Sequence, residues 1–255
     1  VAKGLDLDST AVSVVMTPSP DVVSPAITVL EALQMMHDNK FLTLPVCEDD
    51  GRVIGIVDVM DVIHACGGAD GWQSMFSSAM EIDDDMSDDS SITSYATGGS
   101  KSIKSKPVVP GRSEKTVLTP LNEEQRPVSK LRPSKPITVM ADESILAACQ
   151  ALKKKRGAAS LIINSRGELA GILTDTDVTT RVVSKNVVVS STEVSKVMTP
   201  NPTCVSMTDS ATDALATMVE NHFRHLPVVD EEGSIVGLLD IAKCLNDAIS
   251  RLERS

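Results

Sequence analysis

A hydroxyl and a carboxylate stand three positions apart in residues 171–177, which read G-I-L-T-D-T-D, where an apolar strand pattern gives way to a helical one. Thr174 and Asp177 at such a junction could bind the phosphate and the ribose of a nucleotide, because the first turn of a helix presents free N–H groups to an anion. The same residues also fit a capping box, with Thr174 as the N-cap. Spacing alone leaves a binding site and an ordinary helix cap both open.

The sequence around this junction belongs to a repeat. V-M-T-P-S-P from Val15 recurs as V-M-T-P-N-P from Val197, and this offset of 182 continues without a gap as far as Gly55 and Gly237. A weaker copy, at an offset of 66, relates Gly171 to Gly237. Three copies of one supersecondary unit are therefore present.

Each copy is expected to be α/β (α+β), with a short strand, an amphipathic helix, two further strands joined by a Gly-containing turn, and a second helix. In the third copy these elements are predicted at residues 203–205, 211–220, 226–229, 234–238 and 241–250. One β-α-β-β-α unit cannot cover both faces of its own small sheet. We therefore expect the units to associate in pairs.

The repeat divides the chain into segments. We expect the tail of a missing preceding repeat at residues 1–10, unit 1 at 11–66, a linker at 67–127, unit 2 at 128–190 and unit 3 at 191–255. Units 2 and 3 adjoin and form the natural pair, whereas unit 1 is either unpaired within the chain or paired in trans. The linker is acidic and then rich in Ser, Lys and Pro, and its segregated charge and low hydrophobicity predict disorder.

The composition argues against several classes of function. A net charge of −11 and a pI near 4.8, with no run of Lys and Arg, argue against nucleic-acid and anionic-membrane partners. No stretch approaches the roughly 20 apolar residues that span a bilayer. Five cysteines without close pairing or metal-ligand spacing favour reduced, mostly buried thiols in a cytoplasmic protein.

Four motifs together resemble a known family. They are M-T-P-x-P at the start of a unit, F-x-x-L-P-V before the second strand, D-E-E-G-S-I-V-G across the turn, and G-I-L-T-D-T-D at the junction. This combination resembles cystathionine beta-synthase-type (CBS) domains and covers nearly everything outside the linker. More closely, the chain is similar to eukaryotic proteins with four CBS repeats and a Phox/Bem-type interaction domain, which is absent here. The resemblance implies paired units, called a Bateman module, that sense adenosine-containing ligands.

The resemblance also implies a ligand cleft between units 2 and 3. In that cleft Thr174 would hydrogen-bond the first phosphate and Asp177 would accept from the ribose hydroxyls. From the facing unit, Arg224 and His225 in F-R-H-L-P-V would reach the phosphates. The implied adenine wall comprises Ile137, Val139, Leu161 and Ile162.

The junctions of the other two units differ from that of unit 2. Unit 1 carries Asp58 and Asp61, and unit 3 carries Asp240 and Lys243. Aspartate caps a helix as well as threonine does. A carboxylate would repel a phosphate, however, and Lys243 cannot accept from ribose hydroxyls. We expect these two sites to be degenerate, which leaves one occupied site per pair.

The sequence thus predicts a non-catalytic regulatory module that senses AMP, ADP, ATP or S-adenosylmethionine between units 2 and 3, with Mg²⁺ only alongside ATP and no other cofactor. A homodimer through the CBS units and an unidentified protein partner are also expected. The alternative is a scaffold whose repeats only dimerise and bind no nucleotide. No Gly-rich phosphate loop, nucleophile elbow, Cys-His signature or metal-ligand spacing of histidines favours an enzyme or a metal site.

Overall fold

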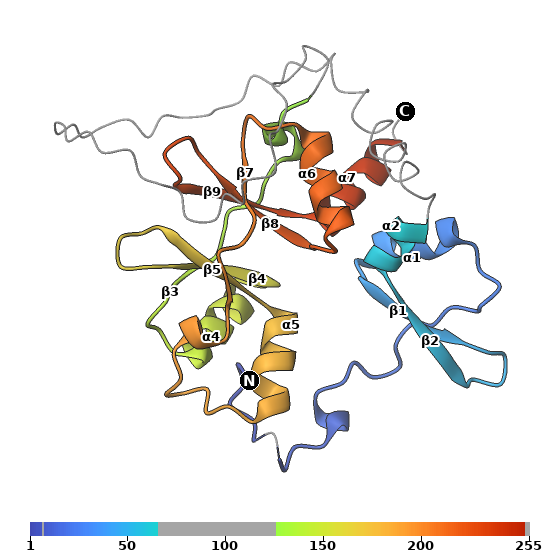
Figure 1. The fold of residues 1–255 in the computed structure, drawn as a ribbon. Helices are drawn as coiled ribbons and strands as arrows, with labels where there is room; N and C mark the ends of the chain where they lie inside the picture. Colours follow the sequence, from blue (N-terminus) through green and yellow to red (C-terminus); the bar gives the residue numbers. More distant parts are fainter. Residues whose placement is uncertain (7, 66–125, 253–255) are drawn as a thin grey trace.

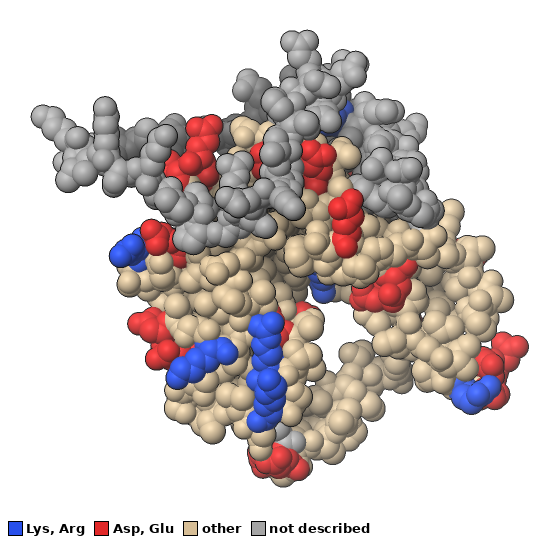
Figure 2. All heavy atoms as spheres, viewed as in Figure 1, with Lys and Arg blue, Asp and Glu red and all other residues tan. Residues whose placement is uncertain are grey.

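The computed structural model describes residues 1–6, 8–65 and 126–252 (Figure 1). The predicted linker, apart from its last two residues, lies outside this part of the chain, and so does Cys66. Unit 3 lies above unit 2 in the ribbon, and unit 1 lies to the right of both (Figure 1). The space-filling view in Figure 2 shows an opening between units 2 and 1, with the N-terminal segment along its lower edge.

Unit 2 shows how the repeat folds. It contains β3 (Thr138–Met140), α4 (Ile145–Lys155), β4 (Ala159–Ile163), β5 (Leu169–Thr174) and α5 (Asp175–Asp177), which runs on into a π-helical turn, η4 (Val178–Val182), and a 3-10 turn, η5 (Val183–Lys185). β4 pairs in parallel with β3 and antiparallel with β5. The Ser144 side chain begins α4 by accepting from the Ala147 N–H, and Arg156 ends it in the left-handed conformation.

Unit 3 repeats this order. It contains η6 (Val194–Lys196), β6 (Thr199–Pro200), β7 (Val205–Ser206), α6 (Ala211–Glu220), β8 (His225–Val229), β9 (Ile235–Asp240) and α7 (Ile241–Leu252). β6 joins the sheet of unit 2, whose strand order is β3-β4-β5-β6, and the second sheet has the order β7-β8-β9.

Unit 1 contains η1 (Val12–Val14), α1 (Val29–Asn39), β1 (Thr43–Cys47), β2 (Val53–Asp58) and α2 (Val59–Ala65). β1 and β2 are antiparallel, and a single bridge from Val23 to Val46 stands where the first strand of the other units lies. A capping box of Thr28 and Glu31 begins α1. The predicted mixed α/β architecture of repeated units is confirmed.

Units 2 and 3 pair through their sheets and through exchanged leader segments. Leu161 and Ile172 pack against Leu238 in one cluster. The leader of unit 2, η3 (Val128–Leu131), lies on unit 3, where the Val128 N–H donates to the Asp209 carbonyl at 2.8 Å. The leader of unit 3, η6, lies on unit 2, where the Val194 N–H donates to the Glu143 carbonyl at 2.8 Å. The exchange is reciprocal, as a two-fold relation between the units requires.

Unit 1 contacts unit 3 through helices. Leu33, Val62 and Met218 belong to one buried cluster that spans the two units. At the same contact the rings of His64 and His222 stack, with centroids 4.2 Å apart. Among the described residues, the sheet of unit 1 pairs with no other sheet. Pairing of unit 1 in trans stays a prediction.

Candidate functional site

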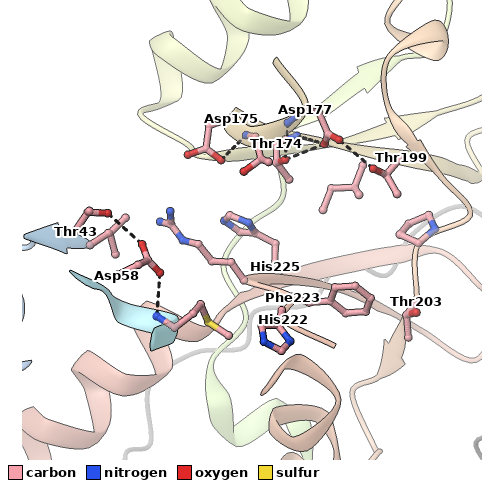
Figure 3. Close-up of a pocket in the computed structure, with 16 residues that line it drawn as sticks. Thr43, Asp58, Thr174, Asp175, Asp177, Thr199, Thr203, His222, Phe223 and His225 are labelled. Atoms are coloured by element: carbon pink, nitrogen blue, oxygen red, sulfur yellow. Dashed lines mark hydrogen bonds between the residues drawn. The ribbon is translucent and has the colours of Figure 1, made fainter. Parts of the chain in front are cut away.

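A cleft of about 600 Å³ opens where the end of β5 faces the start of β8, and we call it the Thr174 cleft. Figure 3 shows Thr174, Asp177 and Thr199 above it and His222, Phe223 and His225 below. Its lining comes from three units: Ile172, Thr174, Asp175, Thr176 and Asp177 of unit 2; Thr199, Pro202, Thr203, His222, Phe223, Arg224 and His225 of unit 3; and Leu42, Thr43, Asp58 and Met60 of unit 1. The structure therefore brings Thr174, Asp177, Arg224 and His225 to one cleft.

Thr174 and Asp177 form the predicted capping box. The Thr174 hydroxyl and N–H both donate to Asp177 Oδ2, at 2.8 and 2.9 Å, and the Asp177 N–H donates back to Thr174 Oγ1 at 3.3 Å. The cap is therefore confirmed. It also fixes the Thr174 oxygen at the cleft wall, because the side chain that caps the helix lines the cleft.

The second carboxylate oxygen of Asp177 is also engaged. Oδ1 accepts from the Thr199 hydroxyl at 3.1 Å and lies 3.2 Å from Arg181 Nη1. The same Arg181 nitrogen donates to the carbonyl oxygens of Val197 and Met198, at 3.0 and 2.8 Å. A carboxylate offers about four lone-pair positions, and four donors approach this one. A ribose hydroxyl therefore has to replace one of them, and the neutral Thr199 hydroxyl is held less strongly than the guanidinium.

Arg181 and Thr199, the two partners of Asp177 Oδ1, were not among the site residues predicted from the sequence. Arg181 lies four residues after Asp177, the spacing at which opposite charges meet on a helix. Thr199 belongs to the M-T-P motif that marks the start of units 1 and 3. The spacing relates Arg181 to Asp177, but no local pattern relates Thr199 to Asp177. That contact depends on β6 joining the sheet of unit 2.

Arg224 and His225 share a carboxylate of their own unit. Arg224 Nη2 lies 3.6 Å and His225 Nε2 lies 3.5 Å from Asp240 Oδ2. Burial acts to raise the pKa of Asp240, but the hydrogen bond and charge of His225, the charge of Arg224 and the Ala242 N–H outweigh it, so the pKa lies below its usual value. Among the described residues, the buried Arg224 Nε has no hydrogen-bond partner.

A second cleft, of about 520 Å³, is built from the equivalent positions of the same pair, and we call it the Asp240 cleft. At the offset of 66, Asp240 replaces Thr174, and Ala158 and Ala159 replace Arg224 and His225. Its lining is Ser134, Lys135, Pro136, Ile137, Lys155, Arg156, Gly157, Ala158, Ala159, Arg224, His225, Leu238 and Asp240.

The predicted adenine wall requires a correction. Ile137 lines the Asp240 cleft instead of the Thr174 cleft. Val139, Leu161 and Ile162 are buried inside the protein and line neither cleft. The physical reason is that each cleft combines the junction of one unit with the strand starts of the other. Ile172, Pro202 and Phe223 supply apolar surface to the Thr174 cleft in their place.

The strand-to-helix junctions of units 1 and 3, which were expected to bind no nucleotide, cap the helices that follow them. The junction of unit 3 also connects α7 to the leader of unit 2. In unit 1, Asp58 accepts from the Met60 N–H at 2.9 Å, and the Asp58 N–H donates to Asp61 Oδ2 at 2.9 Å. In unit 3, Asp240 accepts from the Ala242 N–H at 3.0 Å. Lys243 Nζ donates to the Arg132 carbonyl at 2.9 Å, which ties α7 to the leader of unit 2.

Asp58 also lines the Thr174 cleft, although it belongs to unit 1. The Thr43 hydroxyl donates to its Oδ2 at 3.1 Å (Figure 3). Asp58 and Asp175 thus add negative charge to a cleft that contains Arg224. This contribution was not predicted, because it depends on the packing of helices from units 1 and 3.

No helix in the described part of the chain is both long enough and apolar enough to cross a membrane. Within the same residues, no three His, Cys, Asp or Glu side chains come together in a group that could hold a metal ion. Cys149 and Cys244 are buried free thiols, and Cys47 and Cys204 are partly buried free thiols.

The fold and the cleft define a protein of paired β-α-β-β-α units with a ligand-sized cleft at the junction between units. The family model of the CBS domain matches residues 12–68, 128–184 and 194–247, and the chain belongs to this family.

Relatives of known sequence extend the similarity. The CBS domain-containing protein CBSCBSPB1 of Arabidopsis thaliana is 50% identical over 131 residues, which cover 51% of this chain. CBSCBSPB3 of the same plant is 34% identical over 261 residues, which cover the whole chain. The chain spans 24% of the first relative and 43% of the second. The crystal structure of protein MJ1225 from Methanocaldococcus jannaschii has a TM-score of 0.55 at 15% identity, over 89% of this chain and 66% of that one, and shares the fold.

Proposed function

We propose that this chain is a non-catalytic regulatory module that binds an adenosine-containing ligand in the Thr174 cleft. One observation carries the proposal: Thr174 and Asp177 of unit 2 share a cleft of about 600 Å³ with Arg224 and His225 of unit 3. That volume lies in the range of small-molecule sites. Membership of the CBS family supports a regulatory function.

The polar groups suggest how such a ligand would lie. Its phosphate would accept from the Arg224 guanidinium, and from the Thr174 hydroxyl once that hydroxyl turns away from Asp177 Oδ2. Its ribose would donate to Asp177 in place of Thr199. Its base would contact Ile172, Pro202 and Phe223. Arg224 would give up part of its attraction to Asp240.

Two carboxylates in the Thr174 cleft should make it favour a ligand with a short phosphate chain. Asp58 and Asp175 also line the cleft, so each added phosphate meets more negative charge. We expect AMP to bind more tightly than ATP in the absence of Mg²⁺. Mg²⁺ would reduce this difference by neutralising the triphosphate.

Ligand binding would be transmitted through the connection between units 2 and 3. Asp177 holds that connection directly through Thr199, and Arg181 holds it through the carbonyls of Val197 and Met198. When a ribose hydroxyl replaces Thr199, the connection loses one of these bonds. The relative orientation of the two units then shifts toward the arrangement that the ligand prefers.

Calorimetric titration of the whole chain with AMP, ADP, ATP and S-adenosylmethionine tests the proposal. At least one ligand should bind, and Asp177→Ala should abolish its heat. Asp61→Ala is the matched control, because it removes the equivalent capping carboxylate in unit 1, outside the lining of the Thr174 cleft. Absence of heat with all four ligands would refute the proposal.

A second variant tests the site independently, in case Asp177→Ala does not fold. Arg224→Gln keeps a polar side chain but removes the charge, and it should weaken binding about tenfold or more. Thermal unfolding of both variants shows whether they are folded. A folded Arg224→Gln with unchanged affinity would contradict the assigned phosphate contact.

The alternative is a scaffold that binds no nucleotide, and one observation favours it. Asp177 already accepts from Thr174 and Thr199 and pairs with Arg181, and Asp240 already attracts Arg224 and His225, so these charges are balanced without a ligand. A scaffold of this kind would give no heat in the titration and no shift in unfolding temperature with any of the four ligands.

A further inference from the structure

The two clefts between units 2 and 3 carry opposite charge when their histidines are neutral. Among the described residues that line the Thr174 cleft, three carboxylates accompany one guanidinium: Asp58, Asp175, Asp177 and Arg224. Among those that line the Asp240 cleft, four cations accompany one carboxylate: Lys135, Lys155, Arg156, Arg224 and Asp240. A ligand with several negative charges is therefore favoured in the Asp240 cleft and disfavoured in the Thr174 cleft.

Three of the cations in the Asp240 cleft are not part of the repeat. At the offset of 66, the residues of unit 3 that correspond to Lys135, Lys155 and Arg156 are Asn201, Asn221 and His222. Unit 3 thus folds with two amide side chains and an imidazole at these positions. The fold of the unit does not require Lys or Arg there, and the positive charge is specific to this cleft.

The same three cations have no carboxylate partner. Asp240 attracts Arg224 and His225 of its own unit, at 3.6 and 3.5 Å. Within the described part of the chain, no ion pair joins a carboxylate to the three remaining cations, which are Lys135, Lys155 and Arg156. All three residues are exposed. Their positive charge therefore faces solvent without being neutralised by the described chain.

The positive charge continues outside the cleft, at the end of α4. A run of four exposed basic residues lies there, which corrects the expectation that the chain has no run of Lys and Arg: Lys153, Lys154, Lys155 and Arg156. Residues 126–160 contain eight of the 24 Lys and Arg residues of the chain, and only two acidic ones, Asp142 and Glu143. The rest of the chain is therefore more acidic than the net charge of −11 indicates.

Basic residues in the last turn also stabilise a helix, because they oppose the partial negative charge of its C-terminal carbonyls. That role accounts for the run at the end of α4 by itself. It does not account for Lys135, which precedes β3 and lines the same cleft as Lys155 and Arg156. Two separate segments bring cations to one cleft, and this convergence favours a binding surface.

We propose that this basic surface, formed by Lys135, Lys153, Lys154, Lys155 and Arg156, binds an acidic peptide segment of a partner protein. Glutamate and aspartate side chains of the segment would enter the Asp240 cleft beside Lys135, Lys155 and Arg156. The segment would then continue over Lys153 and Lys154. An extended chain is required, because the cations lie both inside and outside the cleft. The surface is separate from the nucleotide site, since none of its residues lines the Thr174 cleft.

Two other kinds of polyanion fit the basic surface less well. A nucleic acid longer than the surface would extend over acidic parts of the chain. The described lining of the Asp240 cleft also contains no Phe, Tyr or Trp on which a base could stack. A planar anionic membrane would not enter a cleft of about 520 Å³. A short acidic peptide has none of these conflicts.

Fluorescence anisotropy of a labelled peptide of eight glutamates, titrated with the whole chain at low salt, tests the proposal. The peptide should bind, and about 0.3 M NaCl should weaken the binding about tenfold or more, because salt screens exposed charges. A labelled peptide of eight glutamines is the uncharged control and should not bind.

Two double variants with the same loss of charge make the test specific. Lys135→Gln with Lys155→Gln removes two cations from the Asp240 cleft and should weaken peptide binding about tenfold. Lys185→Gln with Lys196→Gln is the matched control, because both lysines are exposed and line neither cleft. Its affinity for the peptide should change less than about twofold. Thermal unfolding of both double variants shows that they are folded.

The chain has an acidic stretch of its own, residues 81–89, which lies outside the described residues. The titration is therefore repeated on a chain in which Asn and Gln replace the aspartates and the glutamate of this stretch. The peptide should bind both chains.

Four results would overturn the proposal. The first is no binding of the peptide to either chain, and the second is an equal loss of affinity in the two double variants. The third is binding only after residues 81–89 are neutralised, which would make the chain's own acidic stretch the occupant. The fourth is a labelled strand of eight deoxythymidines that binds more tightly than the peptide and is weakened by Lys135→Gln with Lys155→Gln. That result would make the surface a nucleic-acid site.

Discussion

The Thr174 cleft and the Asp240 cleft occupy equivalent positions in one pair of units, yet their polar groups are arranged differently. In the first, the hydroxyl of Thr174 shares a cleft with Arg224 and His225 of the other unit. In the second, the carboxylate of Asp240 is held by Arg224 and His225 of its own unit. The repeat determines where a cleft forms. The residues at three positions then set the charge of each cleft, because Asp240 replaces Thr174, Ala158 and Ala159 replace Arg224 and His225, and both clefts share the same Arg224 and His225.

The largest expected difference between the clefts is in stability. Asp177→Ala should lower the free energy of unfolding by about 2 kcal/mol, because it removes the acceptor of the Thr174 hydroxyl and N–H and the carboxylate partner of Arg181, which keeps its bonds to the carbonyls of Val197 and Met198. Asp240→Ala should cost about 1 kcal/mol, since Asp240 is more exposed and its contacts with Arg224 and His225 are longer. Urea unfolding of the two variants measures both values. Equal losses in the free energy of unfolding would contradict the expected difference between Asp177 and Asp240.

The second difference is in the response to acid. Because the pKa of Asp240 is lowered in the folded chain, its charge stabilises the fold above the usual carboxyl pKa, and this contribution is lost as the pH falls through the lowered value. Asp240→Asn should therefore be less stable than the unsubstituted chain at pH 7, by about 1 kcal/mol. The difference should shrink below about pH 4. Thermal unfolding from pH 7 to pH 3 measures it, and a constant difference would exclude a titrating Asp240.

The third difference concerns the ligand. Asp240→Asn removes the negative charge that attracts Arg224, so Arg224 becomes more available to a phosphate in the Thr174 cleft. We expect AMP affinity to rise about threefold to tenfold, on the order of 1 kcal/mol. Asp209→Asn is a control, because Asp209 lines neither cleft. Weaker AMP binding in Asp240→Asn would show that Asp240 positions Arg224 for the ligand.

The smallest effect is expected from Thr199→Val. This substitution removes one donor from Asp177 Oδ1 and should lower the free energy of unfolding by about 1 kcal/mol. The lone pair that it frees would be open to a ribose hydroxyl, so AMP affinity should rise while stability falls. Calorimetry and urea unfolding of the same sample measure the two effects. A fall in both would mean that Thr199 is itself a ligand contact.

The sequence was sufficient to predict the architecture, because the repeat supplies the same pattern three times. A motif such as V-M-T-P or F-x-x-L-P-V is a weak signal alone, but both recur at one offset in units 1 and 3, and the weaker match of unit 2 completes three units in register. The capping box at Thr174 and Asp177 was predictable for the same local reason.

The predicted site was less complete, because it depends on contacts between units. Thr174, Asp177, Arg224 and His225 do line one cleft. The adenine wall that the resemblance implied does not line this cleft, because Leu161 and Ile162 are buried in two different core clusters of the sheet. Asp58 enters the cleft through the helix contact of units 1 and 3, which no local pattern encodes.

The exchanged leaders of units 2 and 3 have a consequence for folding. Val128 precedes unit 2 in sequence but is buried in the core of unit 3, and Val194 precedes unit 3 but is buried in the core of unit 2. Neither core is complete until the other unit has formed. The cooperative folding unit is therefore the pair. A single CBS repeat cut at its sequence boundary would keep its own leader, now uncovered, and would lose from its core the leader that the other unit supplies.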